Sequence, residues 1–337
     1  MWGEARSRYE ALLAQDVSLL RNFRADYRSL IFGVGSIWSP RYHRLVPFMA
    51  FSTADIPTRL STWTKHRELV EINAVGWPLP TPRTILPLHA MLLEPPRPAS
   101  AALYDVERVA GWIDDYVRFR EPIICKASNS RGSGAILVFD DVNRRFGILS
   151  AGHVFPNGIG SAVELELARA LFFSKRVPLG RVSHCIVPPP GTAGYDVAVI
   201  DLNLLNQWDD RHRRPYLTDR IPLHRSTVAV KLRDRFIAPQ PIVVHGAVSG
   251  MISQAAVMGQ LVEVDYGQAT WLNCWLVAPS GMLRSGDSGS AVFTREDSAF
   301  LGLYVGSSGF SKRPLFHYVQ DGWSLQQNVL NGWNISY

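Results

Sequence analysis

Three short segments carry side chains that together have the chemistry for acyl transfer. In the segment 286–289, a serine, Ser288, lies between two glycines and before an apolar run that is typical of a strand. His153 ends an apolar run, and Asp196 begins another. A serine hydroxyl is a weak nucleophile until a base such as histidine removes its proton. A carboxylate can hold that histidine in the productive tautomer, so the three side chains predict a Ser-His-Asp triad.

The order His153, Asp196, Ser288 and the local sequence around each residue resemble the chymotrypsin-like (trypsin-like) serine protease family, in its bacterial-type intracellular form. The resemblance covers residues 119–337. It implies a mainly β fold with two antiparallel β-barrels, at about 121–204 and 226–318, and a C-terminal helix at 323–330. It also implies a serine endopeptidase that hydrolyses protein or peptide substrates through an acyl-enzyme on Ser288.

The resemblance assigns further roles around the nucleophile. The backbone N–H groups of Gly286 and Ser288 are expected to bind the oxyanion, and Asp287 is expected to support their loop. Met282 takes the place of the pocket floor, where an apolar side chain favours small or medium apolar substrate residues over Arg or Lys. The expected substrate pocket consists of Met282, Val305, Gly306 and Ser307. Val305 stands where many family members have a serine that supports the catalytic aspartate.

Two alternatives concern single residues of the triad. A lone histidine at a strand end is more often structural than catalytic. The catalytic interpretation of His153 depends on Asp196 and Ser288, which lie at the spacing typical of the family. Asp201 competes with Asp196 because both lie in the same apolar run. Strand alternation turns Asp201 to the opposite face, which favours Asp196.

Two alternatives concern the function as a whole. The first is a peptide-binding module on the same scaffold with little turnover. The second is a nucleic-acid-associated protein, suggested only by the formal net charge of +6. Because the sequence has no dense basic block, we predict no nucleic-acid partner.

Metals, cofactors and membranes find little support in the sequence. There is no H-E-x-x-H segment and no phosphate-binding glycine loop, so no metal or cofactor is predicted. No apolar run approaches the roughly 18 residues of a membrane span. The three cysteines, an odd and widely spaced set, favour reduced thiols. With Val154 standing where secreted relatives carry a cysteine, these features predict a cytoplasmic protein.

Residues 1–118 are predicted to form a separate, α-rich extension of unknown role. Apolar spacing predicts helices at 5–31 and 100–117, with a strand at 68–75 between them. We expect this extension to recruit a regulatory partner, and the remainder of the chain to fold without it.

No N-terminal cleavage is expected to be needed to assemble the site. The segment that enters the first barrel, 120–126, lacks the apolar terminus that pairs with the aspartate in zymogen-type relatives. A buried, unpaired Asp287 would be costly. An internal cation is therefore expected to pair with it, the candidates being Lys231, Arg233 and Arg284.

Overall fold

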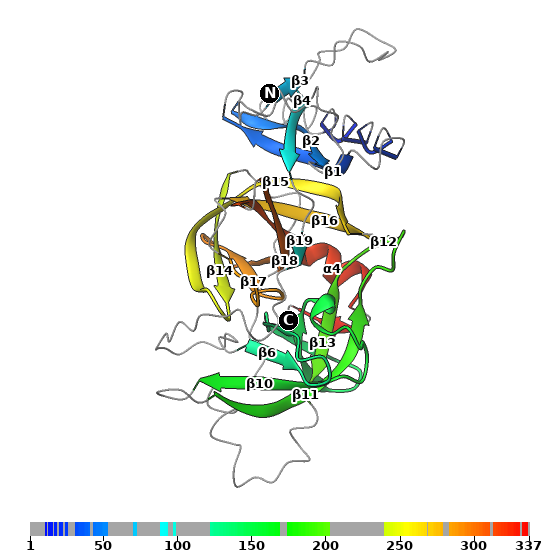
Figure 1. Cartoon of the computed structure of the whole chain (residues 1–337), viewed down its shortest axis with the longest axis vertical. Helices are drawn as coiled ribbons and strands as arrows, with labels where there is room; N and C mark the ends of the chain where they lie inside the picture. The colour runs from blue at the N-terminus through cyan, green and yellow to red at the C-terminus, as the bar shows by residue number, and fades with distance from the viewer. Residues whose placement is uncertain are drawn as a thin grey trace.

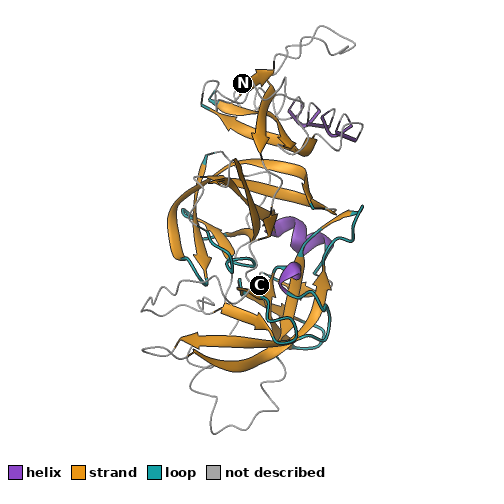
Figure 2. Cartoon of the chain, viewed as in Figure 1, coloured by secondary structure: helices purple, strands orange, loops and turns teal. Residues whose placement is uncertain are grey.

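The computed structural model of the chain consists mainly of β-strands (Figure 2). It describes residues 11–25 in part, 31–52 except 41–42, 70–72, 88–93, 97–98, 122–168, 174–202 and 239–335, the last with gaps at 268, 279–282, 311–312 and 331. The strands form two curled sheets, which confirms the predicted mainly β class. None of the described helices has the length and apolar character that a membrane crossing requires.

Part of the first curled sheet, sheet A, closes into a ring. The strands follow one another in the order β16-β19-β18-β17-β14-β15, and β15 pairs back onto β16. Buried Ile242, Trp275 and Tyr304 help to fill its interior. The strands of the ring are β14 (Gln240–Gly246), β15 (Gly250–Tyr266), β16 (Ala269–Ala278), β17 (Ala291–Thr294), β18 (Phe300–Phe310) and β19 (Arg313–Asp321).

The second sheet, sheet B, is open and runs in the order β20-β8-β9-β13-β11-β10-β6-β7. Its buried face carries Ile148, Leu165 and Ile200. The strands are β6 (Pro122–Cys125), β7 (Arg131–Ser133), β8 (Leu137–Asp140), β9 (Arg145–Ser150), β10 (Ala162–Ala168), β11 (Ser174–Ile186), β13 (Val197–Asp201) and β20 (Trp333–Asn334). In Figure 1 this sheet, largely green, lies beside the yellow-to-brown ring.

A short helix, α4 (Gly322–Asn328), follows the last strand of the ring, where the sequence predicts the C-terminal helix. Asp321 caps it by accepting hydrogen bonds from the backbone N–H (3.0 Å) and the hydroxyl (2.6 Å) of Ser324. Its other carboxylate oxygen accepts from the indole N–H of Trp275 at 3.1 Å. The cap therefore also fixes the helix to the core of the ring.

The described part of the first third is mostly strand, which corrects the expectation of an α-rich extension. β1 and β14 pair with the same edge of β15, β14 with its first half and β1 with its second half, both antiparallel. β2 in turn pairs with the other edge of β1 (Figure 1). The strands are β1 (Ile31–Ser39), β2 (Arg44–Ser52), β3 (Val70–Ile72), β4 (Leu88–Leu93) and β5 (Arg97–Pro98). The apolar stretch from Ile31 is short and buried, which suits a strand.

Of the predicted helix 5–31, residues between 11 and 25 are described in part and are helical, whereas Ile31 instead begins β1. The predicted helix at 100–117 lies outside the described residues. The helical residues bind to sheet A through charged side chains. Arg24, only 2% exposed, pairs with Glu263 at 2.5 Å and with Asp265, and Arg21 also pairs with Glu263. These ion pairs and the β1–β15 ladder connect the first third to sheet A.

Candidate active site

The three predicted triad residues lie within hydrogen-bonding distance of one another. His153 lies in the 3-10 turn η1 (Gly152–Val154) that follows β9, and Asp196 immediately precedes β13. Ser288 lies in the loop between β16 and β17. The Ser288 hydroxyl is 2.6 Å from His153 Nε2, and His153 Nδ1 contacts Asp196 Oδ2. Sheet B thus positions the histidine and the aspartate, and sheet A positions the serine.

A serine of sheet B fixes the nucleophile loop of sheet A. The backbone N–H of Ser133 donates to the Ser288 carbonyl at 2.7 Å, and its hydroxyl donates to the Gly286 carbonyl at 3.1 Å. Gly289 makes this approach possible, because its φ is +90° and a Cβ there would lie 2.4 Å from the Ser133 carbonyl oxygen. The sequence analysis did not assign Ser133 a role, although it lies between two glycines.

The two N–H groups expected to bind an oxyanion are available for it. Among the described residues, neither the Gly286 nor the Ser288 N–H has an acceptor, whereas the carbonyls of both residues are bonded to Ser133. Gly286 has a φ of +95°, a conformation that glycine adopts readily. Free donors beside the nucleophile are what the stabilisation of a tetrahedral intermediate requires.

Asp287 is buried and is held entirely by uncharged donors within the described part of the chain. Its Oδ1 accepts from the N–H groups of Val248 (2.9 Å) and Ser249 (3.1 Å). Its Oδ2 accepts from the N–H of Arg284 at 2.8 Å and from the Ser249 hydroxyl. A Cβ at residue 246 would lie 2.5 Å from Oδ1, so Gly246 makes room for the carboxylate.

The expectation that Arg284 pairs with Asp287 through its charge is therefore wrong. The Arg284 side chain is exposed, and the residue contributes only its backbone N–H. Lys231 and Arg233 lie outside the described residues. Burial raises the pKa of Asp287, and hydrogen bonds from Arg284, Ser249 and Val248 oppose that rise. Several N–H donors can stabilise a buried carboxylate without a salt bridge.

Asp196 is fully buried and gains support from a residue that the sequence did not indicate. Its backbone N–H donates to Gln320 Oε1 at 2.9 Å, and its Oδ1 accepts from the backbone N–H of His153 at 2.8 Å. Gln320 is also fully buried, in β19. Val305, at the position of the expected serine, instead presents its carbonyl oxygen 3.3 Å from the Ser288 hydroxyl.

We expect Gln320→Leu to lower kcat by about 10–100-fold with a small change in KM. The substitution removes the acceptor for a buried N–H, and a small displacement of a catalytic group is costly. Rates should be normalised to active sites titrated with a covalent probe, so that a loss of folded protein does not count.

The matched control is Gln326→Leu in α4, whose amide bonds to the Trp333 carbonyl at 3.2 Å, away from the triad. The control should retain its kcat. An equal loss in both variants would assign Gln320 a purely structural role.

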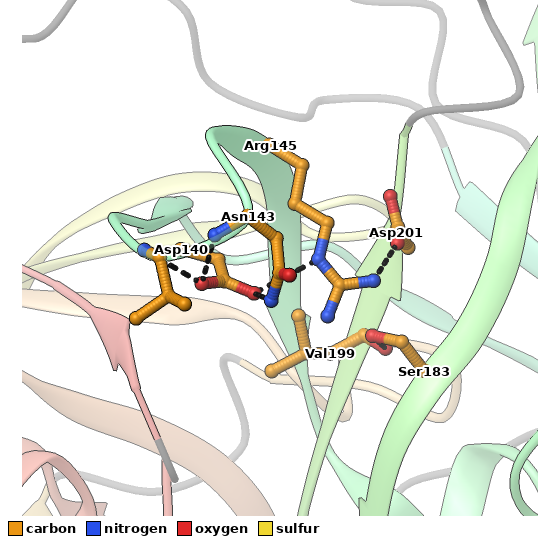
Figure 3. A network of polar contacts seen from close by, with 7 residues as sticks. Asp140, Asn143, Arg145, Ser183, Val199 and Asp201 are labelled. Atoms are coloured by element: carbon orange, nitrogen blue, oxygen red, sulfur yellow. Dashed lines mark hydrogen bonds and ion pairs between the residues drawn. The ribbon is translucent and has the colours of Figure 1, made fainter.

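The competing carboxylate, Asp201, belongs to a separate ionic network (Figure 3). Arg145 donates to Asp201 at 2.7 Å and to Asp140 at 2.9 Å. Burial alone would raise the pKa of Asp140, but hydrogen bonds from Asn143 and Arg145 outweigh it, and the pKa is lowered. Asp201 therefore pairs with a cation in sheet B, whereas Asp196 is the carboxylate that contacts His153.

The expected substrate pocket is described in part. Val305 and Gly306 are buried and Ser307 is half-buried, all in β18, while Met282 lies outside the described residues. The sequence did not indicate Tyr266, whose ring centroid lies 6.4 Å from that of His153 and which stacks on Trp271 at 4.3 Å. Burial and the nearby Asp196 raise the pKa of Tyr266 to about 12, so it stays a neutral phenol.

The three cysteines are unpaired, and two of them have a raised pKa. Burial and the nearby charge of Asp196 together raise the pKa of Cys185 to about 11. Burial likewise raises the pKa of Cys274. A thiol with a raised pKa is a poor nucleophile at neutral pH, so neither Cys185 nor Cys274 is an activated thiol.

Comparisons with solved structures find proteases that resemble this chain only weakly in sequence and structure. Thermobifida fusca protease A matches at 15% identity and a TM-score of 0.42, over 65% of this chain and 97% of that one. Cellulomonas bogoriensis chymotrypsin matches at 15% identity and a TM-score of 0.41, over 65% of this chain and 97% of that one. Nocardiopsis protease matches at 14% identity and a TM-score of 0.41, over 62% of this chain and 94% of that one. No protein-family model and no curated protein sequence matches the chain.

Proposed function

We propose that this chain is a serine endopeptidase of the chymotrypsin-like type. The observation that carries the proposal is the hydrogen-bonded line from the Ser288 hydroxyl through His153 to buried Asp196. The N–H groups of Gly286 and Ser288, which have no acceptor among the described residues, support it, since they lie in the same loop as the proposed nucleophile. The bacterial-type intracellular assignment belongs to the same proposal and is supported by the unpaired cysteines.

The proposed reaction begins with proton transfer. His153 Nε2 takes the proton of Ser288 as its oxygen attacks the carbonyl carbon of a peptide bond. The N–H groups of Gly286 and Ser288 bind the oxygen that becomes negative. The protonated His153, stabilised by Asp196, then gives its proton to the leaving amine, and an acyl-enzyme remains on Ser288.

A water molecule completes the cycle. His153 removes a proton from this water, which attacks the acyl carbon and forms a second tetrahedral intermediate. When that intermediate collapses, Ser288 leaves with a proton returned by His153. The carboxylic acid product is then released, and the enzyme regains its initial protonation state.

A fluorophosphonate probe tests the proposal. We expect one covalent adduct per chain, located at Ser288 by peptide mapping, together with cleavage of an unstructured protein substrate. The Ser288→Ala variant serves as the control that should remain unlabelled. A folded chain that takes up no probe and cleaves nothing would instead support the peptide-binding module.

A further inference from the structure

A segment from the first third of the chain pairs with the strand that carries the expected substrate pocket. β5 (Arg97–Pro98) runs antiparallel to β18, with Pro98 opposite Gly306 and Arg97 opposite Ser307. We infer that β5 is a built-in inhibitory strand, which occupies the edge of β18 where a peptide substrate must bind. This inference rests on the proposed function, because it assigns an occupant to the same cleft.

The edge that β5 occupies is the one that faces the nucleophile. β19 pairs with Gly306 and Ser307 along one edge of β18, so β5 must use the other edge. In the first half of β18, this second edge pairs with β17. The nucleophile loop bonds to the same edge, since the Gly289 N–H donates to the Tyr304 carbonyl at 2.8 Å. One residue further along, the Val305 carbonyl lies 3.3 Å from the Ser288 hydroxyl. β5 therefore pairs with Gly306 and Ser307, the two residues of β18 that directly follow the one in contact with the Ser288 hydroxyl.

The sequence of β5 suits this position. Proline has no N–H, so Pro98 fits only a pair of the ladder that is not hydrogen-bonded. The next pair, Arg97 with Ser307, is then the hydrogen-bonded one. An extended peptide gains its affinity for a strand edge from such backbone pairing, and a segment of the same chain competes at a high effective concentration.

The inhibitory strand has a defined kinetic consequence. A substrate peptide must displace β5 before it can pair with β18, so the apparent KM rises in inverse proportion to the fraction of molecules in which β5 has left that edge. Once the peptide is bound, the triad acts on it unchanged, and kcat stays the same. Peptides long enough to pair with Gly306 and Ser307 are therefore the substrates affected.

A reversible disulfide tests occupancy and inhibition together. Directly opposite residues of an antiparallel pair have Cα atoms about 5.5 Å apart, which suits a disulfide. In full-length Arg97→Cys/Ser307→Cys, mild oxidation should link the two cysteines, as shown by peptide mapping. Peptide hydrolysis should be lost on oxidation and should return on reduction, each sample being compared with its own reduced form.

The outcomes of this experiment separate the two proposals. Failure of the cysteines to link in folded protein would overturn the placement of β5, and a linked protein that still cleaves peptides would overturn the inhibition. Arg97→Cys alone, oxidised in parallel, controls for the native cysteines. If the reduced protein neither cleaves peptides nor takes up the fluorophosphonate, the proposed function fails, while the cross-link still reports on β5.

A release variant gives a second measurement. Replacing Arg97 and Pro98 by glycines weakens an extended strand, because glycine has more conformational freedom to lose. Apparent KM for a long peptide should fall by about tenfold if β5 occupies its edge for about 90% of the time, with kcat unchanged. The matched control, Arg97→Lys, keeps the backbone and charge and should retain the KM of the original chain. An unchanged or higher KM in the glycine variant would contradict the inference.

Discussion

Ser288→Ala is expected to abolish peptide hydrolysis, with a loss of about 10⁶-fold in kcat, because triad members act as a unit. The fold should not suffer. The Ser288 hydroxyl is engaged with His153 Nε2 and the Val305 carbonyl, while the loop is held through backbone groups that alanine keeps. Rates on an unstructured protein, measured beside a thermal melt of each variant, check both parts.

His153→Ala should cause a similar loss, and the double variant should be no worse than either single variant. This non-additivity separates a catalytic pair from two residues that support the fold independently. Turnover retained by Ser288→Ala within tenfold of the original chain would remove the residue from the mechanism.

Asp196→Asn is expected to lower kcat by about 10⁴-fold, and the structure supplies the reason. The backbone N–H of His153 donates to Asp196 Oδ1, so an asparagine there must turn its carbonyl oxygen toward that N–H. Its amide NH₂ group then faces His153 Nδ1 and makes that nitrogen an acceptor. The imidazole proton moves to Nε2, which can no longer take the proton of Ser288.

The matched control is Asp201→Asn, in the same run of sequence and paired with Arg145. It should keep its kcat and lose only stability, measured by urea unfolding. If Asp201→Asn lowered kcat as much as Asp196→Asn, the assignment of the carboxylate would have to be exchanged. A normal rate in Asp196→Asn would leave His153 without an orienting partner.

The sequence predicted the parts of the molecule that depend on local pattern. Ser288, His153 and Asp196 each lie beside a strand with a recognisable neighbouring sequence, and the two curled sheets follow from short strands and turns. Gln320 and Ser133 were missed because their roles depend on contacts with residues more than 100 positions away. A single sequence does not show which buried amide or hydroxyl will meet a distant backbone group.

The same reason explains the errors around Asp287 and in the first third. Charge arguments predicted a cation for Asp287, but backbone N–H groups carry no signal in the side-chain sequence. The strand from Ile31 was overlooked because its partner, β15, comes more than 200 residues later. Apolar spacing detects an amphipathic helix within a few turns, whereas it does not indicate which strands pair.

The pairing of β1 with β15 bears on how the chain reaches its folded state. β1 pairs with β2 along one edge, and along its other edge Gly33 lies opposite Val264, so that second edge stays unpaired until most of the chain has been made. Pairing over such separations is slow, and an unpaired strand edge is prone to aggregation during that time. Ribosome-bound chains that end before residue 250 should therefore expose β1 to chaperones and proteases, and protection should arise late in translation.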